Sequence, residues 1–270
     1  MKKRRFSALV LAVFLCAVTL CSCSAKAESS TSQQELPHIT VGCDDYSPFS
    51  YMNVDGTITG IDVDLAKEAF SRMGYQPDFV FINWEEKKKL LAEGSIDCIW
   101  SSFTMDGRET EYRWAGPYMQ SRQVIAVNEN SPIQTLQDLA DQTIAVQSTT
   151  KPEDIFRSHD PRLPSIRKLI SVQKRDLIFI MLSKGYVDAI AAHDTSVDQF
   201  CAETGLSFRI LSEPLLTVGL GVAFDAHDTR GLDTQLSDVL EEMQQDGTTL
   251  HILSTYLSNA DSYLGESNGN

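Results

Sequence analysis

The sequence has few basic residues for its length. Its 23 lysines and arginines stand against 37 aspartates and glutamates, so the formal net charge at pH 7 is −14. Proteins that hold nucleic acid or anionic lipid by charge need a basic surface, so this balance argues against both kinds of partner. Because salt screens the field beyond about 10 Å, the charge only weakly favours cationic ligands over anionic ones.

Motifs for metals and phosphates are also absent from the sequence. The five histidines are scattered without the spacing of metal ligands on one helix, and no phosphate-binding glycine loop occurs. Three of the six cysteines, Cys43, Cys98 and Cys201, lie outside the N-terminal region and have no metal-ligand spacing. Buried thiols are the simpler interpretation of these three, and a Cys43–Cys98 disulfide is the alternative. We predict neither a metal site nor a cofactor.

The N-terminal apolar run, Ala8–Leu20, follows four basic residues. It is shorter than the ~20 residues that a membrane-spanning helix needs, so a secretory signal is the better interpretation. Its exit, Leu20-Cys-Ser-Cys23, resembles a bacterial lipobox, in which cleavage precedes Cys23 and lipid is attached to its thiol. We therefore predict a lipoprotein signal peptide over 1–22 and a flexible tether over 23–36. Together they would anchor the protein to the extracytoplasmic face of the membrane without spanning it.

Two similar segments indicate two related lobes. Leu91–Ile99 and Leu182–Ile190 each read as a helix end, a C-terminal glycine and a short strand that contains an aspartate. Elsewhere strands alternate with helices, which favours parallel pairing with helices on the sheet faces. We predict an α/β fold with lobe 1 over 37–121 and 219–260, lobe 2 over 122–218, and a polar tail over 261–270.

The segment Ser101–Tyr118 follows a predicted strand and carries hydroxyl groups and one arginine, Arg108. In open α/β sheets, ligands bind just beyond the carboxyl ends of the strands. A guanidinium fork holds both oxygens of a carboxylate, so this segment suits an anion, although it is also compatible with a polar surface loop.

A second candidate position lies just past the matching strand of lobe 2, at Asp194. If the two lobes face each other across a cleft, one offers donors to an anion and the other a carboxylate to a cation. A zwitterion would fit between them. Gln147–Thr150 opens a predicted helix whose free backbone donors could also hold an anion. Asp194 could instead cap the helix that follows it.

Several short motifs, in this order and spacing, resemble one known family. They are Val41-Gly42…Tyr46-Ser47-Pro48-Phe49, Gly60-Ile61-Asp62-Val63-Asp64-Leu65-Ala66, Gly94-Ser95-Ile96-Asp97, Thr104…Arg108…Gly116-Pro117-Tyr118, Val187-Asp188-Ala189 and Gln245-Asp246-Gly247-Thr248. The region Pro37–Leu257 is similar to the bacterial extracellular solute-binding proteins of polar amino-acid ABC transporters, solute-binding protein family 3.

This resemblance implies a periplasmic-binding-protein-like fold. Each lobe would be a mostly parallel sheet flanked by helices, with two hinge strands joining the lobes and the ligand in the cleft. It implies binding of a free amino acid outside the cell and its delivery to an ABC permease by cleft closure, by a protein that is not an enzyme. We expect a monomer and a polar ligand, with basic amino acids slightly favoured.

The resemblance also assigns the site residues. Arg108 matches the arginine that clamps the ligand α-carboxylate, and Ser102 and Thr104 match positions that donate to the same group. Thr149 and Thr150 match further donors to that carboxylate. This set predicts the anion half of the site.

The other half of the site rests on four residues. Asp194 matches the carboxylate that receives the α-ammonium group, and Tyr46 and Trp84 match aromatic positions that enclose the ligand side chain. Asp44 lies near the position that meets a cationic side chain in relatives binding basic amino acids. Three intervals depart from the best-known members: Thr104–Arg108 and Asp44–Tyr46 are each one residue shorter, and Asp188–Asp194 is one residue longer. Trp84 could instead be a core residue, and Tyr46, which precedes Ser-Pro, could be a turn aromatic.

Two other functions use the same fold. A cyclohexadienyl dehydratase-like lyase would need a general acid in the cleft, for which Asp44 or His193 could be recruited. A sensory binding protein would use the same cleft without a permease.

Overall fold

Residues 35–265 are described by the computed structural model of the chain. The predicted signal peptide, most of the predicted tether and the predicted lipidation site Cys23 lie outside the described residues. Residues from Leu36 onward belong to one compact unit. Within the described range, no helix combines the length and the apolar character that crossing a bilayer requires.

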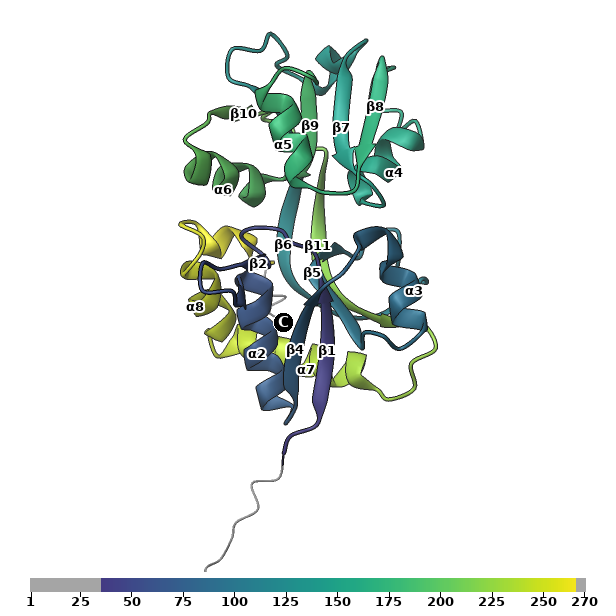
Figure 1. The fold of residues 1–270 in the computed structure, drawn as a ribbon, viewed down its shortest axis with the longest axis vertical. Coiled ribbons are helices and arrows are strands. Elements are labelled where there is room, and N and C mark those ends of the chain that lie inside the picture. Colours follow the sequence, from purple (N-terminus) through teal and green to yellow (C-terminus); the bar gives the residue numbers. More distant parts are fainter. Residues whose placement is uncertain (1–34, 266–270) are drawn as a thin grey trace, which may run out of the picture. The chain divides into compact units, whose positions relative to one another are not determined.

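One mixed sheet forms the centre of the described region (Figure 1). Its strands are β1 (His38–Cys43), β4 (Gln76–Phe81), β5 (Cys98–Thr104), β6 (Tyr112–Asn128), β7 (Thr143–Gln147), β8 (Lys168–Val172), β9 (Ala189–His193), β10 (Phe208–Ile210) and β11 (Leu216–Asp225). The order across the sheet is β4-β1-β5-β11-β6-β9-β7-β8, with β10 paired to β6. Strand β1 pairs in parallel with β4 and β5, and β7 pairs in parallel with β8 and β9. A separate hairpin joins β2 (Tyr51–Met52) and β3 (Ile58–Thr59).

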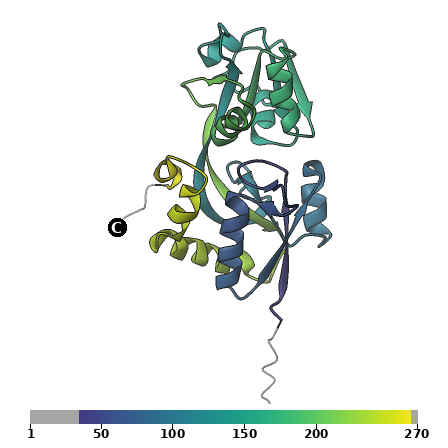
Figure 2. The same ribbon diagram turned by 60° about the vertical axis from the view of Figure 1, so that its left-hand side comes forward.

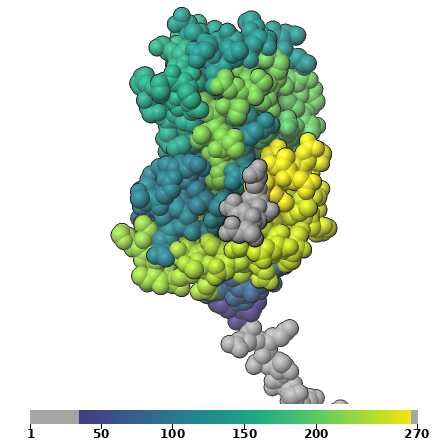
Figure 3. Space-filling view, turned by 180° about the vertical axis from the view of Figure 1, so that it is seen from behind, coloured from purple at the N-terminus to yellow at the C-terminus, as the bar shows by residue number. Residues whose placement is uncertain are grey.

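Strands β6 and β11 run through both halves of the sheet. They pair in antiparallel register from Asp225↔Tyr112 at one end to Leu216↔Gln123 at the other. At the first end β11 also pairs with β5, and at the second end β6 also pairs with β9. Figures 1 and 2 show these two strands as the link between the halves, and the view from behind shows the light-green β11 region between them (Figure 3).

Helices cover both faces of each half. They are α2 (Ile61–Arg72), α3 (Lys87–Ala92), α4 (Lys151–Arg157), α5 (Asp176–Ser183), α6 (Asp194–Thr204), α7 (Leu232–Gln245) and α8 (Thr248–Ser254), with short 3₁₀ turns η1 (Trp84–Glu86), η2 (Leu136–Leu139) and η3 (Ala260–Tyr263). The first lobe holds α2, α3, α7 and α8, and the second holds α4, α5 and α6 (Figure 1). The predicted two-lobed α/β fold with two joining strands is confirmed.

Each lobe has its own apolar core on either side of its sheet. In the first lobe, Phe70, Trp100 and Phe224 are fully buried beneath α2 and α7. A smaller cluster around Phe103 lies on the opposite face, beside α3. The second lobe has separate clusters on its two faces. Burial of this much apolar surface in each half lets both lobes remain folded whether or not they touch.

Cys43 and Cys98 are both buried free thiols. Burial is the main cause that raises the pKa of the Cys43 thiol to about 12. The buried-thiol interpretation is confirmed for this pair, and the alternative of a Cys43–Cys98 disulfide is wrong.

The C-terminal end differs from the predicted polar tail over 261–270. Ala260–Tyr263 form a 3₁₀ turn, and the Tyr263 ring packs against the main core of the first lobe. The buried Ala260 and the Tyr263 ring supply apolar surface that holds this turn against the lobe. Residues 266–270 of the predicted tail lie outside the described residues.

Asp62 connects the core of the first lobe to the end of β5. Its carboxylate is only 1% exposed; Oδ2 accepts the Ser102 N–H at 2.6 Å and Oδ1 accepts the Tyr118 hydroxyl at 2.8 Å. The N-cap of α2 is Gly60, without a side-chain cap. Asp62 therefore holds Ser102 in place rather than capping the helix.

We expect Asp62 to make the stability of the protein depend on pH. Burial raises the pKa of this carboxyl to about 7, against the opposing effect of its two hydrogen bonds. The folded state therefore favours the neutral form, and its contribution to stability is complete below the unfolded pKa near 4 and lost as pH rises through about 7. This contribution is roughly 4 kcal/mol. Asp62→Asn, which imitates the neutral carboxyl, should remove this part of the decline in urea unfolding measurements between pH 4 and 8.

Asp64→Asn is the matched control, because that side chain lies on the same helix and is 37% exposed. Equal pH dependence of the unfolding free energy in wild type and Asp62→Asn would contradict the assignment.

Candidate functional site

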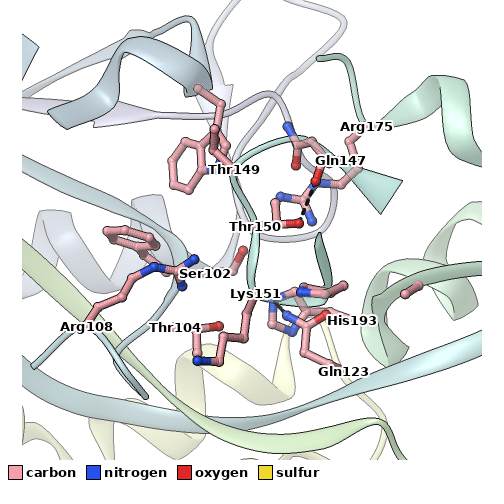
Figure 4. Close-up of a pocket in the computed structure, with 14 residues that line it drawn as sticks. Ser102, Thr104, Arg108, Gln123, Gln147, Thr149, Thr150, Lys151, Arg175 and His193 are labelled. Carbon is pink, nitrogen blue, oxygen red and sulfur yellow. Dashed lines mark hydrogen bonds between the residues drawn. The ribbon is translucent and has the colours of Figure 1, made fainter. Parts of the chain in front are cut away.

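A pocket lies between the lobes, beside the strands that join them. Figure 4 shows side chains from both lobes around it. It is lined by Trp84, Ser102, Phe103, Thr104, Arg108, Gln123, Gln147, Thr149, Thr150, Lys151, Pro152, Arg175, Ala191 and His193. The lining residues of the first lobe come from η1, β5 and the loop after it. Those of the second lobe come mainly from the ends of β7 and β9 and the start of α4. This is the carboxyl-end location expected for an α/β sheet.

Arg108 reaches the pocket from the loop that follows β5. Its side chain is 10% exposed, and Nη2 lies 2.7 Å from Oδ2 of Asp154 in the second lobe. The guanidinium also lies over the Phe103 ring, with Cζ 5.4 Å from the ring centroid. This packing fixes the plane of the guanidinium while leaving other donors of its fork for a second anion.

Ser102 and Thr104 both line the pocket, as the sequence predicts. Ser102 has a φ of 44° and lies at an irregularity in the pairing of β5 with β11. A left-handed serine is unfavourable by itself, and the bond from its N–H to Asp62 compensates for this cost. The buried Ser102 Oγ has no partner among the described residues.

Thr149 and Thr150 line the opposite wall. The Thr149 N–H is not free, because it donates to Glu153 Oε2 at 2.6 Å. The Thr149 hydroxyl accepts from Lys87 Nζ at 2.8 Å, and the Thr150 hydroxyl donates to the Gln147 carbonyl at 2.6 Å. The expectation of free backbone donors before α4 is therefore wrong for Thr149, although both hydroxyl oxygens lie at the pocket.

The two predicted aromatic residues have different positions. Trp84 lines the pocket, and its Nε1 is buried without a partner in the described part of the chain. Tyr46 is not a lining residue. Its ring lies behind the wall, with the Arg175 guanidinium carbon 3.3 Å from the ring centroid and the ring of His193 beside it at 6.0 Å.

Asp44 does not meet the pocket either. Its Oδ2 accepts from Gln147 Nε2 at 2.7 Å and lies 3.5 Å from Arg175 Nη2, and it lines a neighbouring cavity instead. Because its charge is already engaged by groups of the second lobe, the structure gives no support for the prediction that Asp44 selects a cationic side chain.

Asp194 occupies a different place from the one predicted. It is 1% exposed and absent from the lining residues; Oδ2 accepts from Arg122 Nε at 2.8 Å and Oδ1 from the Thr195 N–H at 2.8 Å. The expectation that Asp194 confronts Arg108 across the cleft is not met. The residue before it, His193, points to the pocket instead, because side chains alternate along β9.

His193 is held as a neutral ring. Gln123 Nε2 lies 2.8 Å from its Nε2 and Ser121 Oγ lies 2.8 Å from its Nδ1. With the Gln123 amide donating to Nε2, the ring proton is on Nδ1 and is donated to Ser121. Burial, followed by the charge of Arg175, lowers the pKa of His193 to about 3.

Several pocket residues were not predicted from the sequence. They are Gln123, Lys151 and Arg175, whereas Gln147 was named only as part of a helix start and His193 only as a possible general acid of a lyase. Gln147 and His193 end the predicted strands β7 and β9, so the rule that ligands bind at strand ends could have found them. The extra residue between Asp188 and Asp194 was a second signal for His193. Arg175 immediately precedes α5 and lies in none of the motifs described above, so it had no such signal.

The lobes are closed on each other in this structure. Besides the contact of Arg108 with Asp154, Glu85 of the first lobe accepts from Ser148 Oγ at 2.7 Å and from the Gln173 side chain. The closed pocket leaves a cavity of only about 20 Å³. A ligand must therefore enter while the lobes are apart. Within residues 35–265, no group of histidine, cysteine and carboxylate side chains is arranged to hold a metal ion.

Comparisons with known proteins agree with this architecture. Residues 39–259 match the model of the bacterial extracellular solute-binding proteins, family 3. The chain is 30% identical to the putative amino-acid ABC transporter-binding protein PatH of Vibrio harveyi over 83% of this chain and 90% of that protein. It is 28% identical to the histidine-binding periplasmic protein of Escherichia coli K12, over 78% and 84% of the two chains.

Among solved structures, a mutant of the ArgBP protein from T. maritima superposes with a TM-score of 0.72 and 28% identity, covering 82% of this chain and 96% of that one. The family model spans most of the chain and both lobes. The chain therefore belongs to the bacterial extracellular solute-binding proteins, family 3.

Proposed function

We propose that this protein captures a free amino acid outside the cytoplasm and delivers it, in the closed form, to an ABC permease. The observation that carries the proposal is the convergence of Arg108 with the hydroxyls of Ser102 and Thr104 on a pocket whose other wall belongs to the second lobe. A carboxylate held by this set would be bound by charge-assisted hydrogen bonds out of water. Two relatives, an amino-acid ABC transporter-binding protein and a histidine-binding protein, support the same ligand class.

Closure is the step that makes such a protein useful to a transporter. A ligand that contacts both lobes stabilises the closed arrangement by its differential affinity, and the closed surface is what a permease would recognise. One chain supplies both walls of the pocket, so we propose that it acts as a monomer.

Neither group suggested as the general acid of a lyase is available for that role. Both ring nitrogens of His193 are hydrogen-bonded, and the Asp44 carboxylate is held by Gln147 and Arg175. Binding without chemistry is therefore the function that the site supports best.

Replacement of Arg108 by alanine should weaken ligand binding by about a hundredfold or more, because each charge-assisted bond contributes roughly 1.5–3 kcal/mol. The ligand is first found by a thermal-shift screen of the twenty amino acids with cystine and ornithine, since a bound ligand raises apparent stability. Titration calorimetry then compares wild type, Arg108→Ala and the control Arg113→Ala, whose side chain pairs with Asp233 on another part of the first lobe. Affinity of Arg108→Ala within a few-fold of wild type would remove the basis for the proposed carboxylate clamp.

Replacement of Glu85 by alanine should speed ligand release without changing the pocket lining. Glu85 is not a lining residue, but it accepts hydrogen bonds from two side chains of the second lobe. Loss of these bonds should favour the open form and raise the dissociation rate about three- to tenfold, measured by stopped-flow fluorescence. Glu86→Ala is the matched control, because Glu86 is exposed and makes no such bond within residues 35–265. An unchanged dissociation rate in Glu85→Ala would show that these bonds do not hold the lobes together.

We further propose that lipid on Cys23 holds the protein at the extracytoplasmic face of the membrane. Mass spectrometry of the protein purified from its native membrane should find an N-terminus at Cys23 that carries the lipid mass. An unmodified N-terminus at another residue would refute the anchor and leave the binding function untouched.

A further inference from the structure

The charged side chains that line the pocket are all cationic. Arg108, Lys151 and Arg175 are lining residues, and the described lining contains no aspartate or glutamate. Lys87 lies directly behind the wall, 6% exposed, with its Nζ 4.7 Å from the Trp84 ring centroid and bonded to oxygens of Trp84 and Thr149. Four cations therefore surround a space that leaves little room for water.

Only two of these cations have a carboxylate within ion-pair distance among the described residues. Asp154 pairs with Arg108 at 2.7 Å, and Asp44 lies 3.5 Å from Arg175. Lys87 and Lys151 make no ion pair with any residue in 35–265. Burial, and then the charge of Arg108, lowers the pKa of Lys87 to about 8, so the amine is still mostly protonated at pH 7. The site has a surplus of positive charge that a ligand can balance.

Lys151 reaches across from the second lobe to the loop that carries Arg108. A side chain on Gly107 would place its Cβ 2.5 Å from Lys151 Nζ, so the glycine leaves the room that the ammonium group occupies. Gly107 also has a φ of 74°, which favours glycine. This arrangement brings two cations from opposite lobes to one end of the pocket.

The buried polar atoms that lack a hydrogen-bond partner indicate which further groups a ligand should carry. Trp84 Nε1, Arg175 Nε and Ser102 Oγ can donate, whereas Gln123 Oε1 and Gln147 Oε1 can only accept. Buried groups of this kind cost free energy unless a ligand completes them. The donors need acceptor oxygens, and the cations favour acceptors that carry negative charge. The two amide oxygens offer a neutral site for an ammonium group, at a place where no carboxylate lines the pocket.

We infer that the site selects a small solute with two acidic groups and a net negative charge. The acidic amino acids are the members of this class that also carry an ammonium group for the amide oxygens of Gln123 and Gln147. The inference rests on the proposed function, because it specifies the ligand of the same pocket. It departs from the sequence-based preference for basic amino acids, which rested on Asp44 and on the net negative charge.

Titration calorimetry with matched pairs of solutes tests this inference. L-glutamate and L-aspartate are compared with their neutral amides, L-glutamine and L-asparagine, and with L-arginine and L-histidine. We expect one acidic amino acid to bind about tenfold or more tightly than its amide, because the amide cannot balance the buried cations. Glutarate and succinate show whether the ammonium group contributes. If they bind as well as the amino acids, the selectivity for two acidic groups stands without a role for the ammonium.

Equal or tighter binding of L-glutamine, L-asparagine, L-arginine or L-histidine would overturn the inference, while the proposed amino-acid binding function would stand. If none of the solutes in this panel binds, and the wider amino-acid screen is also negative, both the inference and the proposed function fail.

The variant Lys151→Met tests the selection of an acidic ligand by changing the protein instead of the ligand. The variant should lower the affinity for the acidic ligand about tenfold and reduce its advantage over the amide, because one unpaired cation is removed. Lys168→Met is the matched control, since Lys168 is an exposed lysine on β8 of the same lobe. An unchanged ratio of acid to amide affinity in Lys151→Met would count against charge selection even if absolute affinities changed.

Discussion

The antiparallel pairing of β6 with β11 is the constraint on which the site depends. Both strands belong to both lobes, so the ends of β5 and β9 are brought to one place by the same antiparallel pair, which has one irregularity between Leu220 and Val222. Gln123 lies on β6 itself and bonds to His193 on β9, which ties the floor of the pocket to this pair of strands.

In the closed form, the buried cations contact groups that balance only part of their charge. Asp154 and Asp44 each cross from one lobe to a cation of the other, so the lobes can meet with some of their charge already balanced. Lys87 meets only neutral oxygens of Trp84 and Thr149. A buried cation with neutral partners is less stable than one with a counter-ion, so an anionic ligand would stabilise the closed form more than the open form.

Most of the fold could be predicted from the sequence, because it rests on patterns that repeat. The helix–glycine–strand segments before β5 and β9 gave the two lobes, and the motif around Arg108 gave one wall of the pocket. The features that the sequence did not reveal depend on contacts between individual residues that are far apart in the chain. Asp62 lies in the first turn of α2, yet its buried carboxylate bonds to a distant N–H, that of Ser102. Such a contact leaves no periodic signal along the chain.

The exchange of Asp194 for His193 shows how one residue can alter the chemistry of a site. An extra residue after Asp188 moves the carboxylate onto the first turn of α6, where Arg122 binds it, and puts an imidazole on the pocket side of β9. Burial keeps that imidazole neutral, so it supplies no negative charge to a ligand ammonium group. The Gln123 and Gln147 amide oxygens are weaker acceptors than a carboxylate, and affinity must then come mainly from the anionic groups of the ligand. A site built in this way discriminates by the number of acidic groups more than by the presence of an amine.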